Sequence, residues 1–249
     1  FFGIGGGGFL LHYDGQSEAI VAYDGRERAP AGARPDMFLD ARGQPLAQLD
    51  AQASGRSIGA PSLVAMLKLA HEEHGRLAWA QLFEPAIALA ENGFAVSPRF
   101  HRLVTMAGQS MRLRADFAAR AYFFDAAGQP WPVGHVLRNP AYAQTLRAIA
   151  AQGPSALTHG PIADAILAAA RRAPRAGTLT LADLAVSPRR VEPVCGAFRV
   201  YRVCGMGPPS SGATTIAILG LYQRARPHPV GASDADDWAA FLWASRLAY

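Results

Sequence analysis

The sequence has few cysteines, almost no lysine and no long hydrophobic run. Its two cysteines, Cys195 and Cys204, are too few for a disulfide framework or a zinc site. We expect them to be core thiols, with a single bridge between them as the alternative. Gly, Arg or Asp interrupts each apolar stretch well before the roughly 18 to 20 residues that a membrane-spanning helix needs. The sequence therefore predicts no membrane span.

A concentrated charge of one sign is also absent. The 24 basic and 19 acidic residues leave a formal net charge of +5, and Lys68 is the only basic residue that is not an arginine. No block of five like charges occurs, so the excess is diluted over the surface. This pattern predicts no nucleic-acid partner and at most a weak preference for a small anion.

The 249 residues, half of them apolar, provide ample material for a buried core. We expect a single domain over residues 1–249. Because the chain opens at Phe1 and stops at Tyr249 inside an expected helix, we expect it to be part of a longer polypeptide. Any signal peptide would lie outside these residues.

Periodicity predicts strands near the two ends of the chain and helices in the middle. Alternation over 9–14 and 18–24, joined around Asp14-Gly15, predicts a hairpin, and 192–203 reads as one further strand. Residues 121–137 read as a short strand, a turn and an extended return. Helices are expected over 62–75, 79–92, 98–114, 140–152, 161–172, 181–184, 211–224 and 234–249, with Ser97, Thr180 and Ser211 as N-caps and Gly93 as a stop. The pattern favours a layered α/β domain over a helical bundle.

Two glycine patterns suggest familiar sites, but their context does not fit. Residues 3–8 satisfy G-x-G-x-x-G, yet a strand follows them, whereas a dinucleotide site needs a helix there. A tight strand entry, where another backbone or a ligand passes close, is the favoured interpretation. Residues 55–59 match the G-x-S-x-G elbow around Ser57, but the polar segment upstream is not the apolar strand that an elbow requires. A structural strand or turn leading into the next helix is favoured over a Ser57 nucleophile.

Two other groups of polar residues have ordinary explanations. His71 and His74 are spaced i, i+3, whereas a helical zinc pair uses i, i+4, so a solvated helix end is favoured. Thr214 and Thr215 follow a hydroxyl-rich turn in which Ser211 is expected to cap a helix, and we assign neither threonine as a nucleophile.

Arg26 is the binding residue that the sequence predicts. It follows the second strand, beside the glycine-rich entry to the first, and its planar guanidinium matches the two oxygens of a carboxylate. A surface ion pair is the alternative.

Taken together, the segments resemble the large subunit of the γ-glutamyltransferases, the glutathione hydrolase family of N-terminal-nucleophile hydrolases. Their order and spacing make the resemblance specific, and it runs nearly from end to end. It rests on GIGGGGF at 3–9, GRERAP at 25–30, DMFLD at 36–40, SIGAP at 57–61, AWAQLFEPAIALAENGFAVSPRF at 78–100, RNP at 138–140, the glycines at 153 and 160, LTLADLA at 179–185 and GPPSSG at 207–212.

The resemblance implies an α/β fold, a four-layer αββα sandwich that two subunits cut from one precursor make jointly, with a helical middle in the large-subunit part. It implies acyl transfer from glutathione or another γ-glutamyl compound to the N-terminal threonine of the small subunit, and then to water or to an amino-acid or peptide acceptor. In this resemblance Arg26 holds the substrate's α-carboxylate. No cofactor or metal is implied, and the family points to the periplasm or the cell exterior.

The chain departs from the family pattern at four places. Gly207 and Ala213 replace a proline and a glycine of the turn, Ser62 replaces the glycine after SIGAP, and Thr158-His159 replace an aromatic pair. No segment resembles the threonine-led start of the small subunit, so we expect no catalytic residue in this chain and no turnover by it alone. A glutaryl (cephalosporin) acylase-like relative, a non-catalytic binding member and a serine hydrolase built on Ser57 are the alternatives.

Overall fold

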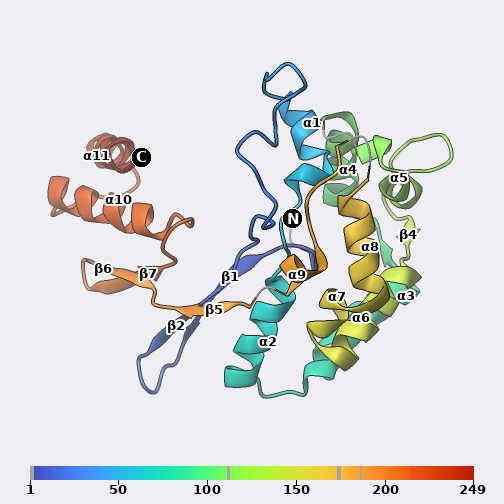
Figure 1. The fold of residues 1–249 in the computed structure, drawn as a ribbon. Helices are drawn as coiled ribbons and strands as arrows, with labels where there is room; N and C mark the ends of the chain where they lie inside the picture. The colour runs from blue at the N-terminus through green and yellow to red at the C-terminus, as the bar shows by residue number, and fades with distance from the viewer. Residues whose placement is uncertain (1–2, 111–112, 173–174, 186) are drawn as a thin grey trace. The chain divides into compact units, whose positions relative to one another are not determined.

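The computed structural model describes residues 3–110, 113–172, 175–185 and 187–249. The chain divides into two compact units. The helical unit comprises Phe1–Gly7 and Arg26–Ser187, and the sheet unit comprises Gly8–Gly25 and Pro188–Tyr249 (Figure 1). The single domain expected over residues 1–249 stays a prediction.

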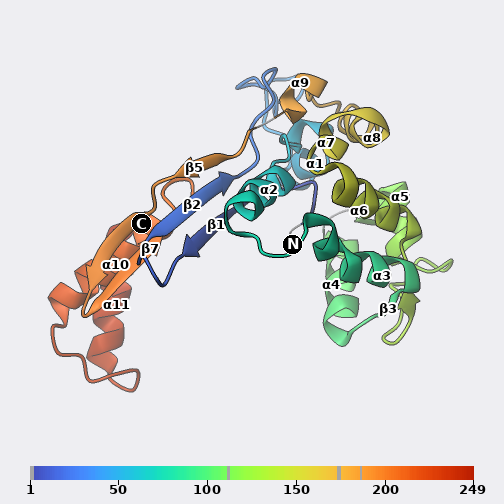
Figure 2. The same cartoon turned by 90° about the horizontal axis from the view of Figure 1, so that it is seen from below.

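The sheet unit contains a three-stranded antiparallel sheet, a second hairpin and two helices. Its strands β1, β2 and β5 are neighbours in that order (Figure 2). The elements are β1 (Gly8–Tyr13), β2 (Ile20–Gly25), β5 (Arg189–Val191), β6 (Val194–Phe198), β7 (Tyr201–Gly205), α10 (Gly212–Ala225) and α11 (Ala235–Ala248). The register pairs Gly8 with Gly25 and Tyr13 with Ile20, which confirms the expected first hairpin.

The second hairpin corrects two expectations. Residues 192–203 do not form one strand, because the chain reverses between β6 and β7 at Arg199, whose φ of 56° lies in the left-handed region. The reversal places Cys195 directly opposite Cys204, and a disulfide joins them. The prediction of core thiols is therefore wrong, and the bridge that was the alternative is present.

The helical unit consists mainly of helices, with a long irregular segment between β2 and its first helix. Its elements are α1 (Gln48–Gln52), the 3₁₀ turn η1 (Gly55–Ser57), α2 (Leu63–His74), the 3₁₀ turn η2 (Trp79–Phe83), α3 (Glu84–Asn92), β3 (Phe94–Ala95), α4 (Pro98–Ser110), the 3₁₀ turn η3 (Leu113–Ala115), α5 (Phe117–Phe123), β4 (Val136–Leu137), α6 (Pro140–Gln152), α7 (Ser155–Thr158), α8 (Gly160–Ala170) and α9 (Leu181–Leu184). None of the described helices has the length and apolarity needed to cross a membrane.

Most helix ends lie where the sequence places them. Ser97 Oγ accepts a hydrogen bond from the Phe100 amide, Thr180 accepts one from Asp183, and Gly93 has a φ of 85°. Ser211 is the residue before α10, but its side chain makes no cap bond, so that cap is not formed.

Two helix predictions need correction. The helix expected over 79–92 starts as the tighter turn η2 and becomes α-helical only at Glu84. Residues 121–123 end α5 instead of forming a strand. The expected return is present as an isolated bridge between Phe124 and Pro130 and as the short strand β4, which pairs with β3. The expected helix over 98–114 runs across residues 111–112, which lie outside the described residues.

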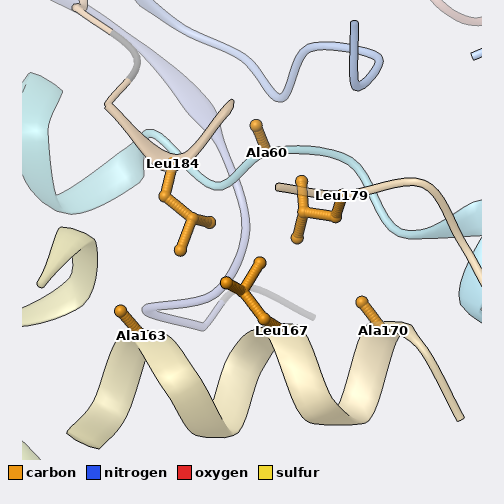
Figure 3. Close-up of a cluster of buried hydrophobic side chains, with 6 residues drawn as sticks. All are labelled: Ala60, Ala163, Leu167, Ala170, Leu179 and Leu184. Carbon is orange, nitrogen blue, oxygen red and sulfur yellow. The ribbon is translucent and has the colours of Figure 1, made fainter. Parts of the chain in front are cut away.

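Two buried clusters hold the glycine run and the SIGAP segment in the helical unit. The first packs Ala60 against the apolar face of α8 and against the segment leading through α9 (Figure 3). Its members are Ala60, Ala163, Leu167, Ala170, Leu179 and Leu184. The second joins α2, α6 and α7 through Val64, Ile149, Ala156 and Leu157, and Ile4 packs against it. Burial of these side chains supplies the main driving force that fixes both segments.

Candidate functional site: an arginine-lined cavity

The segment after β2 lines an open cavity of about 550 Å³ in the helical unit. Segments that are far apart in the sequence meet there: the glycine run, GRERAP, DMFLD and SIGAP. The lining residues are Gly5, Arg26, Glu27, Arg28, Ala29, Pro30, Ala33, Met37, Phe38, Arg56, Ser57, Ile58 and Gly59. Arg26, the binding residue predicted from the sequence, is thus in the wall of a cavity large enough for a small ligand.

Glu27 links Arg26 to the glycine run. Its Oε2 lies 3.6 Å from Arg26 Nε, and its Oε1 accepts a hydrogen bond of 2.7 Å from the Gly7 amide. The Arg26 side chain is 50% exposed, so solvent screens this ion pair and its contribution to stability is about 0 to 1 kcal/mol. Glu27 therefore orients the guanidinium without burying it.

The N-terminus of α2 fixes the backbone on two sides of the cavity. Ser62, which is 2% exposed, donates its hydroxyl to the Arg26 carbonyl at 2.8 Å. The amides of Ser62 and Leu63 both donate to the Gly6 carbonyl, at 3.1 and 3.0 Å. Amides in the first turn of a helix have no partner within the helix, and here the glycine run supplies one. The first turn of α2 thus bonds to the backbone of the glycine run. An added Cβ would meet nothing within 4 Å at Gly3 or Gly5 and only an ordinary contact at Gly6, so the predicted approach close enough to require glycine is not found at these three positions.

Two further contacts hold the GRERAP segment in place. Arg28 and Ala60 exchange backbone hydrogen bonds as an isolated antiparallel bridge. Just past Pro30, the Ala31 amide donates to Asp183 Oδ1 at 2.8 Å, while Asp183 Oδ2 accepts from the amide and hydroxyl of Thr180. The hydrogen bonds from Thr180 and then Ala31 lower the pKa of Asp183, because they stabilise its charged form.

Arg56 connects this cavity to a second one. Its Nη1 donates to the Met37 carbonyl at 2.8 Å and lies 3.5 Å from that of Leu39. Both Arg56 and Met37 also line a neighbouring cavity of about 450 Å³. Sequence reasoning missed Arg56 and Ser62, since an arginine inside a G-x-S-x-G pattern and a serine before a helix are ordinary features. Only the folded chain places them beside Arg26 or its cavity.

The structure supports neither the dinucleotide site nor the nucleophile elbow that the two glycine patterns suggest. Strand β1 begins at Gly8, so the described chain has no helix after the glycine run to receive a pyrophosphate. Ser57 ends the turn η1, and its hydroxyl donates to the carbonyls of Gln52 and Ser54, both at 2.9 Å. No strand precedes Ser57 in the way that an elbow requires, because α1 and η1 lie there.

The histidines and threonines also have structural roles. His71 Nε2 lies 2.8 Å from the Leu77 carbonyl and its ring packs edge-on against Trp79, so it is more enclosed than the solvated helix end that we expected. Within the described ranges, no group of three or more His, Cys, Asp or Glu side chains could hold a metal ion. Thr214 and Thr215 lie inside α10 in the sheet unit.

Comparison with known proteins identifies what the chain is similar to. The family model described as gamma-glutamyltranspeptidase matches residues 1–249. The glutathione hydrolase proenzyme of Escherichia coli is 34% identical over 249 residues, which are 99% of this chain and 42% of that protein. The proenzyme of Bacillus subtilis is 32% identical over 211 residues, which are 84% of this chain and 35% of that protein. The chain thus spans well under half the length of these relatives.

The fold also has solved counterparts. The gamma-glutamyltranspeptidase of Helicobacter pylori is 31% identical, with a TM-score of 0.90 over 99% of this chain and 69% of that one. The cephalosporin acylase of Bacillus halodurans matches with a TM-score of 0.77 at 23% identity, over 99% of this chain and 45% of that one, a likeness of fold alone. These matches confirm the expected N-terminal-nucleophile hydrolase fold with its helical middle.

Proposed function

The chain belongs to the gamma-glutamyltranspeptidase family, and from this premise we propose that it is the large-subunit part of a glutathione hydrolase whose Arg26 binds the α-carboxylate of a γ-glutamyl donor. The observation that carries the proposal is the position of Arg26 in the wall of a 550 Å³ cavity, with half of its side chain exposed. A guanidinium can hold both oxygens of a carboxylate at once.

The contacts around Arg26 support a positioning role. Ser62 fixes its carbonyl, and Glu27 restrains its guanidinium from one side. A donor that is anchored at its far carboxylate presents its scissile amide at a fixed place, which lowers the entropic part of the barrier. The function of Arg26 is therefore orientation, and the bond-breaking groups belong to another segment.

The reaction that we propose is acyl transfer. The N-terminal threonine of a small subunit from the same precursor attacks the γ-amide, and its own α-amino group accepts the hydroxyl proton. The leaving amine departs with a proton, and the γ-glutamyl ester then passes to water or to an amino-acid or peptide acceptor. Oriented donors stabilise the oxyanion in each step. This chain alone lacks the nucleophile and is inactive, and we place the enzyme in the periplasm or outside the cell.

Two assays on the complete two-subunit protein test the proposal. A γ-glutamyl anilide and a glutaryl anilide both present a carboxylate at the same distance from the amide, and they differ in the α-amino group. We expect cleavage of the γ-glutamyl compound. Cleavage of the glutaryl compound alone would instead identify an acylase of the same fold.

The coding sequence beyond Tyr249 tests the remaining alternative. A threonine-led segment at a cleavage point is expected there. Its absence would make the protein a non-catalytic binding member that retains only the carboxylate site. Labelling of the isolated chain at Ser57 by a serine-directed fluorophosphonate would support the alternative of a serine hydrolase with Ser57 as its nucleophile.

A further inference from the structure

Arg56 occupies the boundary between the two adjoining cavities of the helical unit. Both cavities, of about 550 and 450 Å³, have Arg56 and Met37 in their walls, and Arg26 lines only the larger one. A ligand anchored at Arg26 can therefore extend along the larger cavity toward Arg56. The two arginines come from the GRERAP segment and from η1, which the sequence separates by about 30 positions.

The guanidinium of Arg56 is held by one nitrogen only. Nη1 donates to the carbonyls of Met37 and Leu39, and no other acceptor for Nε or Nη2 lies within the residues that the structure describes. The Nε–Nη2 edge is one that binds a carboxylate with two parallel hydrogen bonds. Because the side chain is partly buried and already anchored, little rotamer entropy is lost when it binds a ligand.

Besides Arg26, the larger cavity is lined by Arg28 and Arg56, and Arg56 is the better site for an anion. Arg28 also lines the larger cavity, but its Nη2 donates to the Ser187 carbonyl at 3.4 Å. The acid whose pKa responds to Arg56 is Asp36, and Arg34 already binds both of its oxygens at 3.0 and 3.2 Å. Glu27 is engaged with Gly7 and Arg26.

We propose that Arg56 binds a second carboxylate of the donor, the one at the free end of the leaving peptide. The inference rests on the proposed function and narrows the substrate class. The preferred donors are γ-glutamyl peptides that end in a free carboxylate. γ-Glutamyl amines and arylamides have no second carboxylate for Arg56 to bind. Arg26 holds one end of such a donor and Arg56 the other, so the scissile amide lies between two fixed points.

A matched pair of donors tests this in the complete two-subunit protein. Glutathione carries the terminal carboxylate, and glutathione carboxamide, amidated at its glycine, lacks that charge. We expect wild-type kcat/KM to be roughly tenfold to a hundredfold higher for the acid than for the amide, as for a hydrogen-bonded charged group. In Arg56→Gln this ratio should fall below about threefold, since the amide side chain provides neither the charge nor the fork.

Two controls separate recognition from general damage. Arg42→Gln changes an exposed arginine that lines neither cavity, and it should keep the wild-type ratio. Turnover of a γ-glutamyl anilide, which has no second carboxylate, measures any general loss in each variant. Arg56→Lys keeps the charge without the fork and should retain an intermediate ratio.

The outcomes distinguish the inference from the function on which it rests. No cleavage of any γ-glutamyl compound by the wild type would reject the proposed function. Cleavage without preference for the acid over the amide would overturn the role of Arg56 while leaving the function intact, and this result needs no variant. A preference that persists unchanged in Arg56→Gln would overturn it as well.

Discussion

The hydroxyl of Ser62 donates to the carbonyl of Arg26 at 2.8 Å, joining the first turn of α2 to the arginine that lines the larger cavity. The two residues are 36 positions apart. In the family pattern a glycine is expected at the position of Ser62, and a glycine has no side chain that could make this bond. Ser62 therefore adds a restraint on the backbone of Arg26 that the family pattern does not contain.

We expect Ser62→Ala to lower the free energy of unfolding by about 1 to 3 kcal/mol. The substitution removes the donor from a buried position and leaves the Arg26 carbonyl without this hydrogen bond. Chemical denaturation of the two proteins measures the difference. Ser155→Ala is the matched control, because that exposed hydroxyl donates to the carbonyl of Gln152, three residues earlier, and its loss should cost no more than about 0.5 kcal/mol. Equal effects at the two positions would contradict the role given to Ser62.

Arg26→Ala should mainly raise KM for γ-glutamyl donors. Loss of a charged hydrogen-bonding group should reduce kcat/KM by the equivalent of roughly 2 to 3 kcal/mol, provided that donor binding is the step affected. Steady-state kinetics of the complete two-subunit enzyme measure this, and circular dichroism confirms that the variant is folded. Arg42→Ala, at an exposed position outside the cavity, should leave KM at the wild-type value. Unchanged kinetics in Arg26→Ala would remove this arginine from the site.

The sequence predicts those parts of the fold that are governed by local signals. The hairpin around Asp14-Gly15 follows from strict alternation and a turn pair, and Thr180 caps α9 as its spacing to Asp183 indicates. Arg26 could be singled out because strand ends beside glycines form ligand sites. For the hairpin turn and the Thr180 cap, the relevant residues lie within a few positions of one another.

The remaining features depend on contacts between distant segments. The reversal at Arg199 has no glycine to mark it, so 192–203 reads as one strand and the pairing of Cys195 with Cys204 stays open. The segment 121–123 is short and contains two aromatic residues, so its sequence is compatible with a strand as well as with a helix. The helix forms because Asp116 caps the N-terminus of α5. Arg56 becomes a candidate only when the loop carrying Met37 folds against it.

Leu179→Ala should destabilise the helical unit by about 2 to 5 kcal/mol, the usual cost of removing a buried leucine side chain. Leu179 is fully buried against α8 and Ala60 in the first cluster (Figure 3). Thermal or chemical unfolding measures the loss. Leu181→Ala is the control two residues further on, where the side chain is 46% exposed, and it should cost under about 1 kcal/mol. A smaller loss at Leu179 than at Leu181 would contradict this packing.

Gly55→Ala tests whether the G-x-S-x-G segment is a packing feature. A Cβ at Gly55 would overlap the backbone carbonyl of Ala170, which cannot move aside as a flexible side chain can. We expect a loss of at least about 1 to 3 kcal/mol in unfolding free energy. Gly15→Ala adds a methyl group where nothing lies within 4 Å and should be nearly neutral. If Gly55→Ala were as stable as Gly15→Ala, the close approach to Ala170 would be wrong.

Asp183 should contribute a stabilisation that disappears in acid. Its pKa is lowered in the folded chain by hydrogen bonds from Thr180 and Ala31, so the ionised form favours folding. The stabilisation is fully present above the unfolded pKa of about 3.9 and is lost as the pH falls through the lower, folded pKa. Asp183→Asn should therefore be less stable than wild type at pH 7, and the gap should narrow steadily between about pH 5 and pH 2. Unfolding free energies measured across this range for both proteins test the sign, and a gap that stays constant or widens in acid would show that Asp183 does not act through its charge.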